Sequence, residues 1–481
     1  MVEVHVSARS LGPFVDLVGD ARKSLHAGVA DKLRVALGDA TIWNVNSTAA
    51  GGGVAEMLRP LLRYVRGMGV RTGWLVIDGP PSFFTITKRL HNALHDARGD
   101  GSPLGPVQAQ HYEEVLAQNL IELRRYVRRG DIVILHDPQT AGLVPGLLEA
   151  GARVIWRCHI GHEERGTEVD AGWAFLRKYV EQAPLAVFSR HAYAPRWLPE
   201  KRAVTLPPNI DPFSTKNQWL PEVSVRAILD CADLVEIVGR CERAVFVRDD
   251  GEPGEVKRKA EVIREDDYKP PWETPLVVQV SRWDRMKDHI GVMHGFARML
   301  SDEPQLEAGL VLAGPSLGGV ADDPEGPEVL AEIEHAWRTL PPRARARVQI
   351  AQLPMDDIDE NAAIVNALQR HAAIIVQKSL REGFGLTVTE AMWKRRPIVA
   401  SAVGGIKDQI RDGVHGLLVC DPTDEEETAS ALRRILEDRA LGERLADAAH
   451  ARVLESYLTI GSLERWANLM RLVVEGHSRA A

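Results

Sequence analysis

The sequence lacks long hydrophobic runs, an excess of positive charge and an export signal. No stretch of 18 or more apolar residues occurs in its 481 residues, so no transmembrane helix is predicted. Residues 1–20 show no basic segment followed by an apolar core. The formal net charge is −8, from 59 Lys and Arg against 67 Asp and Glu, which gives no general attraction for nucleic acid or membrane surfaces. We therefore expect a cytoplasmic protein that binds neither nucleic acid nor membrane.

Cysteine is also scarce. The four cysteines, Cys158, Cys231, Cys241 and Cys420, show no CxxC spacing and no clustering. This pattern predicts neither a disulfide framework nor a zinc site, and it fits a reducing compartment.

From about residue 72 onward, short β-rich runs alternate with segments of helical periodicity, such as 54–69 and 111–127. This alternation is typical of parallel sheets covered by helices. The predicted strands of the first half are 72–79, 131–137, 152–160, 185–190 and 202–209. Those of the second half are 276–284, 308–316, 347–354, 372–379, 396–405 and 415–421. The pattern predicts an α/β protein with two doubly wound, Rossmann-like domains facing a ligand cleft.

The stretch 244–275 is dense in charge, proline and glycine, which indicates a connection between domains. The predicted division is an N-terminal domain at 1–250, a linker at 251–275 and a C-terminal domain at 276–460. A final amphipathic helix within 461–481 is expected to pack back toward the N-terminal domain.

The segment SRWDRMKD (281–288) follows a predicted strand and leads into a predicted helix. Arg282 and Lys287 would lie there at the carboxyl edge of a sheet, where side chains and helix amides can bind a diphosphate. A solvated basic turn is the alternative explanation of the same residues.

The segment REGFGLTVTE (381–390) places Glu382 before a glycine turn and Glu390 on the helix expected over 386–395. Gly383 and Gly385 would let backbone amides approach a ligand closely. Carboxylates accept hydrogen bonds from vicinal hydroxyls, so one glutamate could bind a hexose and the other a ribose. Glu390 could instead form a structural salt bridge. A glycosidase pair is also conceivable, although hydrolysis needs no diphosphate site.

These motifs, together with 397–410, resemble the retaining glycosyltransferases of family 4, which have the GT-B fold. In the first half, NSTAAGGGVAEMLRPLL (46–62), KRLHNALHD (88–96), ILHDPQTAGL (134–143), IWRCHIG (155–161) and LPPNIDPFSTKN (206–217) resemble the trehalose glycosyltransferring synthases within that family. The related trehalose phosphorylases share these motifs. The resemblance covers most of the chain.

The resemblance implies a role for each matching position. The catalytic positions would be Arg282, Lys287, Glu382 and His159. The donor would be bound by Gly51, Gly52, Gly53, Arg282, Lys287, Glu382, Gly383, Phe384, Gly385, Leu386, Thr387 and Glu390. The acceptor would be bound by Asp137, with His91 and Asn92 as further candidates. In such enzymes a donor phosphate oxygen takes the acceptor's proton, so these side chains would mainly position substrates.

The implied reaction transfers glucose from an NDP-glucose to glucose, giving α,α-trehalose and NDP with retention of configuration, and is expected to be reversible. Two alternatives stay open: a trehalose phosphorylase that uses inorganic phosphate and glucose 1-phosphate, and a non-catalytic sensor of sugar nucleotides. No cofactor and no metal are expected, because 159–164 and 91–96 lack an HExxH pattern. A homodimer is the expected assembly.

Overall fold

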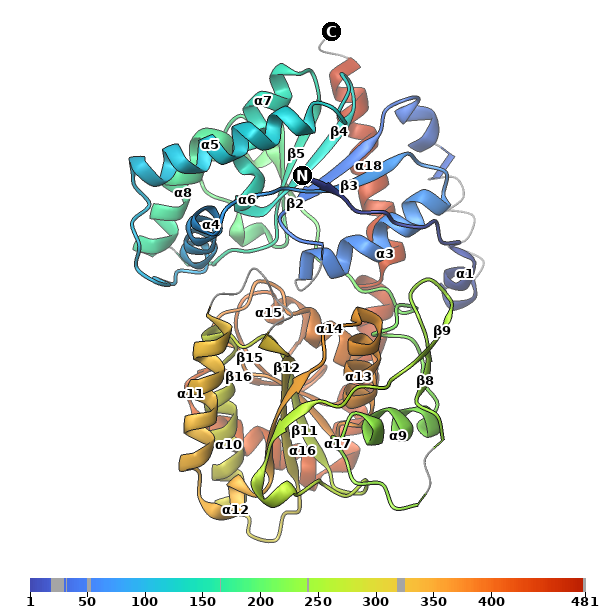
Figure 1. Cartoon of the computed structure of the whole chain (residues 1–481), viewed down its shortest axis with the longest axis vertical. Coiled ribbons are helices and arrows are strands. Elements are labelled where there is room, and N and C mark those ends of the chain that lie inside the picture. The colour runs from blue at the N-terminus through green and yellow to red at the C-terminus, as the bar shows by residue number, and fades with distance from the viewer. Residues whose placement is uncertain are drawn as a thin grey trace. The chain divides into compact units, whose positions relative to one another are not determined.

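The computed structural model describes residues 1–18, 30–31, 33–49, 53–164, 166–239, 242–317 and 325–478. Its chain forms two compact units, one of Met1–Asn209 with Tyr457–Ala481 and the other of Ile210–Ser456. Each unit is an α/β sandwich built on a seven-stranded sheet (Figure 1). The predicted fold class, two Rossmann-like domains, is confirmed.

The sheet of the first unit has the order β1-β3-β2-β4-β5-β6-β7, in which only β1 runs antiparallel to its neighbour. Its strands are β1 (Val2–Glu3), β2 (Ile42–Asn46), β3 (Thr72–Val76), β4 (Ile132–His136), β5 (Arg153–Cys158), β6 (Leu185–Phe188) and β7 (Ala203–Thr205). Because β3 and β4 lie on opposite sides of β2, the strand order reverses there. This is the switch point at which such sheets bind ligands.

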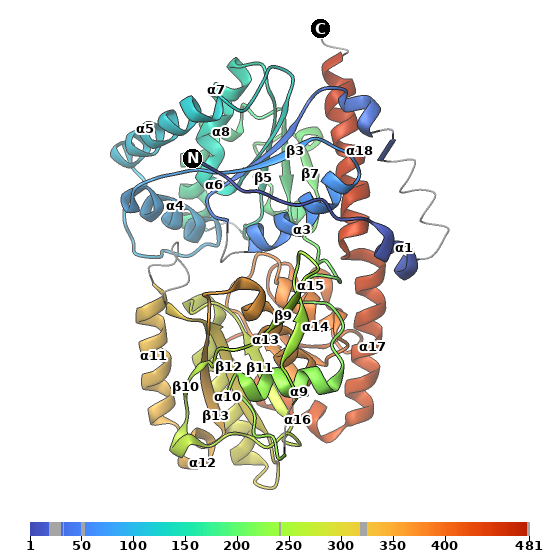
Figure 2. The same ribbon diagram turned by 45° about the vertical axis from the view of Figure 1, so that its right-hand side comes forward.

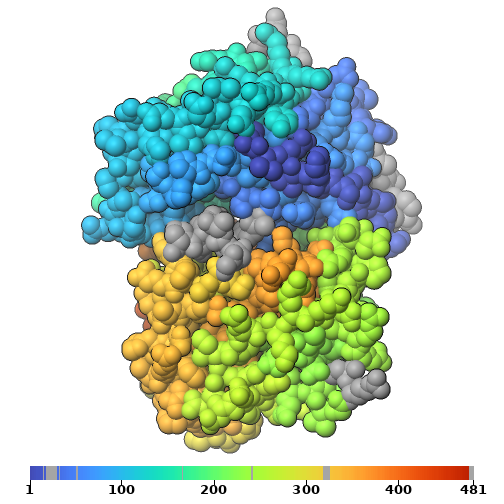
Figure 3. Space-filling model, viewed as in Figure 1, coloured from blue at the N-terminus to red at the C-terminus, as the bar shows by residue number. Residues whose placement is uncertain are grey.

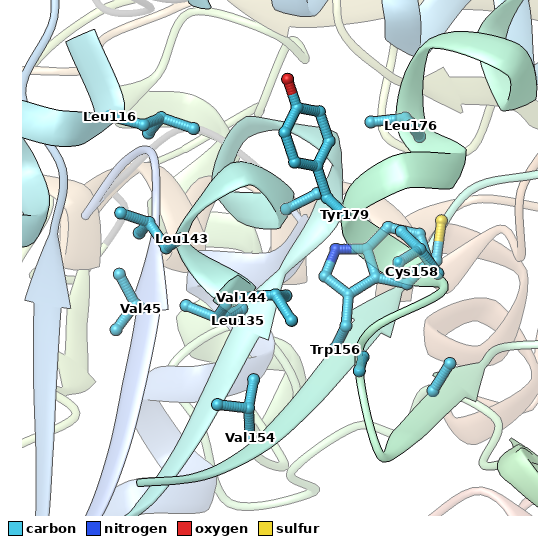
Figure 4. Close-up of a cluster of buried hydrophobic side chains, with 14 of the residues drawn as sticks. Val45, Leu116, Leu135, Leu143, Val144, Val154, Trp156, Cys158, Leu176 and Tyr179 are labelled. Carbon is cyan, nitrogen blue, oxygen red and sulfur yellow. The ribbon is translucent and has the colours of Figure 1, made fainter. Parts of the chain in front are cut away.

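Helices surround this sheet: α1 (Gly12–Val18), α3 (Gly53–Gly67), α4 (Pro81–Leu94), α5 (Pro106–Leu123), α6 (Asp137–Thr140), α7 (Val144–Glu149), α8 (Thr167–Val180) and α18 (Thr459–Ser478). The strand β4 is buried along its whole length, as expected for a central parallel strand. Leu135, Trp156 and Tyr179 belong to the large core cluster between the sheet and α5, α7 and α8 (Figure 4). The long helix α18, although last in the chain, lies beside α3 in this unit (Figure 2).

The second sheet has the order β10-β13-β12-β11-β14-β15-β16, with only β10 antiparallel. Its strands are β10 (Glu261–Ile263), β11 (Leu276–Val280), β12 (Gly309–Pro315), β13 (Val348–Leu353), β14 (Ile374–Gln377), β15 (Ile398–Ser401) and β16 (Leu417–Val419). Here the order reverses at β11, between β12 and β14. The second switch point therefore combines the loops that follow β11 and β14.

The helices of the second unit are α9 (Glu222–Cys231), α10 (His289–Asp302), α11 (Gly326–Thr339), α12 (Pro342–Arg345), α13 (Ile358–His371), α14 (Leu386–Trp393), α15 (Ile406–Gln409), α16 (Glu425–Glu437) and α17 (Arg439–Ser456). None of the helices in the described part of the chain is long and apolar enough to cross a membrane.

The structure differs from the predicted division at two points. Residues 210–250 belong to the second unit, and the predicted linker 251–275 is part of it as well. This region contains the hairpin of β8 (Val245–Val247) and β9 (Pro253–Glu255) and the edge strand β10. Residues of this span, drawn in green shades, spread over one face of the second unit (Figure 3).

Long-range ion pairs explain why the charged span folds onto the second unit. Arg248 and Arg258 pair with Asp357 and Glu360 near the start of α13, and the Glu265 carboxylate binds Arg345 at 2.6 Å. The composition that suggested a solvated linker thus reflects charges with partners about 80 to 110 residues away in the sequence.

Candidate functional site

The first switch point carries a cluster of polar side chains at the ends of β2, β4 and β5. His136 ends β4, Asp137 follows it, and His159 follows β5. The Asp137 carboxylate accepts a hydrogen bond from the backbone N–H of His159 at 2.7 Å. Asp137 has a φ of 63°, a left-handed conformation that only a few side chains tolerate, and this conformation brings the strand directly into α6. The structure therefore brings two predicted site residues, Asp137 and His159, together.

A hydrogen-bonded chain fixes the two histidines. His136 Nε2 lies 3.0 Å from the side-chain oxygen of Asn44, and His136 Nδ1 lies 3.0 Å from His159 Nε2. Both distances are within hydrogen-bonding range, so Asn44 and the two imidazoles form one continuous polar chain across β2, β4 and the end of β5. The rings stack with an interplanar angle of 15°.

Arg157 supports this chain from the interior. Its side chain is 1% exposed, and Nε lies 3.4 Å from His159 Nδ1 and 3.0 Å from Nε2. Its guanidinium also lies over the ring of Trp466, from α18, at 5.2 Å. A residue near the C-terminus thus packs against the group that orients His159.

Burial sets the charge of this cluster. Desolvation, followed by the field of Arg157, lowers the pKa of His136 to about 3 and the pKa of His159 well below its usual value. Burial raises the pKa of Asp137 to about 7, against the smaller opposite effects of its hydrogen bond from His159 and of Arg157. Both imidazoles are therefore neutral at pH 7, which suits a site for uncharged hydroxyl groups.

The other predicted positions of the first unit are placed differently. Gly51 and Gly52 lie outside the described residues, and Gly53 begins α3. His91 and Asn92 lie on α4, where Asn92 is 4% exposed. A Cβ at Gly99 would come within 2.4 Å of the Asn92 side chain, so Asn92 packs against that turn. Their acceptor-binding role stays a prediction.

The second switch point joins the loops that follow β11 and β14. The Lys287 ammonium forms an ion pair of 2.7 Å with the Glu382 carboxylate. Ser379 Oγ also donates to Glu382, at 3.3 Å, and the backbone N–H of Leu380 donates to the carbonyl of Met286 at 2.8 Å. The structure therefore brings the basic loop and the glutamate turn into contact. Arg282, half-buried, follows β11 in the same loop.

Packing within the second unit explains the glycines of this turn. Gly385 has a φ of 86° and directly precedes α14, where a side chain would be strained. A Cβ at Gly405 would come within 2.6 Å of the Phe384 backbone, and Gln409 of α15 donates to the carbonyl of Phe384. The motifs at 381–390 and 397–410 are thus two halves of one packed turn. The backbone amides of Leu386 and Thr387 form the start of α14.

Glu390 is 3% exposed and is held by two partners. Its carboxylate pairs with Lys216 at 3.1 Å and accepts a hydrogen bond from Gln369 at 3.1 Å. The salt bridge that was one explanation of Glu390 is therefore present. The contact of Glu390 with a ribose stays a prediction.

Sequence reasoning missed a buried ion pair beside Lys287. Lys378 is fully buried at the end of β14, and its ammonium pairs with Asp288. Asp288 has a φ of 50° and caps α10 through a hydrogen bond of 3.1 Å from the backbone N–H of Gly291. This pair joins the same two loops as Lys287 and Glu382. The available signal was a lysine directly after a strand that is otherwise buried.

Comparisons with known proteins agree with this geometry. Residues 44–195 match the family described as "Trehalose synthase, N-terminal domain", and residues 263–452 match "Glycosyl transferases group 1". A trehalose synthase of Pyrococcus horikoshii is 32% identical over 97% of both chains, and a trehalose phosphorylase of Grifola frondosa is 25% identical over 98% of this chain and 63% of its own. A trehalose-phosphate synthase structure from Burkholderia vietnamiensis, 15% identical, covers 91% of this chain and 98% of its own with a TM-score of 0.67.

The two sheets and the matched families thus define a glycosyltransferase with the GT-B fold. Within that class, the near full-length similarity shows that the chain belongs to the trehalose synthase family.

Proposed function

We propose that this protein transfers glucose from an NDP-glucose to the anomeric hydroxyl of glucose, giving α,α-trehalose and NDP with retention of configuration. The observation that supports this most directly is the Lys287–Glu382 pair at the second switch point, beside the start of α14. A cation, a carboxylate and helix amides together match a ligand with both phosphate and hydroxyl groups.

In the proposed donor site, Arg282 and Lys287 neutralise the diphosphate and stabilise its departure as NDP. Glu382 accepts hydrogen bonds from the hexose hydroxyls, while the amides following Gly383 bind the phosphate or the sugar. Glu390, with Lys216 beside it, is the proposed partner of the ribose hydroxyls.

In the proposed acceptor site, Asp137 accepts a hydrogen bond from the acceptor glucose, with His91 and Asn92 as further candidates, while His159 lies near the hexose 6-hydroxyl group. A neutral His159 can donate or accept without attracting the anionic donor. The bond between the donor C1 and its phosphate oxygen breaks as the acceptor oxygen bonds to C1. The acceptor's proton passes to a donor phosphate oxygen, so no side chain has to act as a base.

The test is a product assay with free glucose and ADP-, UDP- or GDP-glucose, run beside glucose 1-phosphate as donor. Trehalose with released NDP supports the proposal and names the base. Trehalose formed only from glucose 1-phosphate would instead establish a phosphorylase, the alternative that the Grifola frondosa relative favours. Absence of product from every donor would favour the sensor of sugar nucleotides.

We also propose that the reaction requires no metal or other cofactor, which unchanged turnover in excess chelator would test. The proposed assembly is a homodimer in the cytoplasm. A monomer mass from light scattering would refute the dimer.

A further inference from the structure

A cavity of about 680 Å³ lies in the first unit, between α8, the loop that follows β5 and the segment 192–197. Its volume falls in the range of small-molecule sites, which is about 300–1,000 Å³. None of the predicted acceptor or donor positions is among its lining residues. The cavity is therefore not accounted for by the proposed reaction.

Aromatic side chains form one wall of this cavity. Trp173 and Trp197 meet edge to face, with ring centroids 5.9 Å apart, and Tyr193 is 2% exposed. A Cβ at Gly161 would come within 2.4 Å of the Tyr193 ring, so the loop after β5 packs directly on that ring. The wall is fixed by close packing, while Trp197 remains partly exposed. Trp197 is thus the ring of this wall that can contact the apolar C–H face of a sugar ring, while Trp173 and Tyr193 hold it in place from the core.

Charged groups of both signs surround the aromatic wall. Glu164 and Asp170 supply carboxylates, and Arg177 and Arg196 supply guanidinium groups. The Arg177 guanidinium lies over one face of the Trp197 ring, 5.4 Å from its centroid, and pairs with Glu181 at 3.2 Å. This mixture favours neither a simple anion nor a simple cation. It offers acceptors and donors to a neutral ligand with many hydroxyl groups.

A phosphorylated ligand fits less well. The first turn of α8 contains Asp170, which lines the cavity, and Glu168, which pairs with Arg89, so carboxylates already occupy the helix end at which a phosphate would otherwise bind. The cavity therefore differs in charge from the proposed donor site of the second unit, whose charged groups include Lys287.

The cavity shares a loop with His159. The carbonyl of His159 accepts a hydrogen bond from Ser189 at 3.2 Å, and a few residues further on Glu163, which lines the cavity, pairs with Arg190. A ligand in the cavity would therefore contact a loop whose first residue belongs to the acceptor site. We propose that this cavity binds a neutral mono- or disaccharide, in addition to the two sugars of the proposed reaction.

Trehalose titrated into the full-length protein by calorimetry tests the proposal. Ala174 is exposed on α8 and lines the cavity, so Ala174→Trp should fill it without disturbing the core. Ala171 is exposed on the same helix but is not part of the lining, so Ala171→Trp is the matched control. Equal melting temperatures would show that both variants fold.

We expect Ala174→Trp to lose one equivalent of bound trehalose that the unmodified protein and Ala171→Trp both retain. Equal stoichiometry in all three proteins, or equal loss in both variants, would overturn the proposal. The result is independent of the proposed function, because a failed product assay would leave this one-equivalent difference unchanged.

Discussion

The two switch points of this protein differ in the charge of their side chains. In the first unit, burial keeps His136 and His159 neutral by lowering the pKa of each. In the second unit, Lys287 and Lys378 are matched by the carboxylates of Glu382 and Asp288. Neutral imidazoles suit the sugar hydroxyls of the proposed acceptor, whereas the ammonium group of Lys287 suits the diphosphate of the proposed donor. The same strand topology thus supports two kinds of site, because the side chains at the strand ends differ.

The largest expected effect is on the charged site. Glu382→Ala should abolish measurable transfer, a loss of about 10³-fold or more in kcat/KM, since it removes both the proposed sugar contact and the partner of Lys287. Lys287→Ala should weaken the use of donor far more than the use of glucose. Steady-state assays with each substrate varied will measure both effects.

The matched control is Glu332→Ala. Glu332 pairs with Arg285 of the same loop at 2.6 Å, but at the surface. Turnover like that of the unmodified protein in Glu382→Ala, or an equal loss in the control, would contradict the assignment of Glu382.

Breaking the buried ion pair of Lys378 and Asp288 should mainly lower the free energy of unfolding. Lys378→Met leaves the Asp288 carboxylate without its partner and should lower the free energy of unfolding by about 3 kcal/mol. The double variant Lys378→Met/Asp288→Asn should recover most of that loss, because asparagine still caps α10. Chemical denaturation measures both values. If the double variant is no more stable than the single one, the loss of the ion pair is not the cause of the lower free energy of unfolding.

The raised pKa of Asp137 should make the stability of the protein depend on pH. The pKa of Asp137 is raised to about 7, so the folded state retains a proton that the unfolded chain releases near pH 4. Stability contributed by this proton is present below pH 4, is lost as the pH rises to about 7, and does not change further above that. Asp137→Asn removes this dependence.

The melting temperature of Asp137→Asn, relative to the unmodified protein, should therefore rise between pH 4 and pH 7. Allowing for the partial exposure of Asp137, the change corresponds to about 2 kcal/mol. A difference that stays constant with pH would show that Asp137 has an ordinary pKa.

The smallest expected effect concerns Glu390. Lys216→Met removes its ion pair and should raise the KM for NDP-glucose by about three- to tenfold, with little change in the KM for glucose. Lys269→Met, which breaks an ion pair of 2.7 Å with Asp233 in the same unit, is the control. Equal changes in the KM for both substrates would contradict the proposed role of Glu390 in binding the donor.

Much of the fold could be predicted from the sequence, because buried parallel strands are visible as short apolar runs. The run at 132–136 is buried throughout, as its composition indicated. The strand β2 was missed, since Asn44 and Asn46 interrupt its apolar pattern and asparagine is rare in strands. Both have distant partners: the side-chain oxygen of Asn44 lies 3.0 Å from His136 Nε2, and Asn46 accepts from the indole of Trp74 at 2.8 Å while also donating locally to the carbonyl of Thr48.

The sequence by itself determined the fold class, the family and the positions of the two glutamates and the basic loop, because these follow from local periodicity and from motif spacing. Only the tertiary structure decided that residues 210–275 belong to the second unit, that Lys378 joins the loops that follow β11 and β14 and that Trp466 supports Arg157. These features depend on contacts between residues far apart in the chain. Burial and charge pairing arise only when such residues meet, so no local pattern contains them.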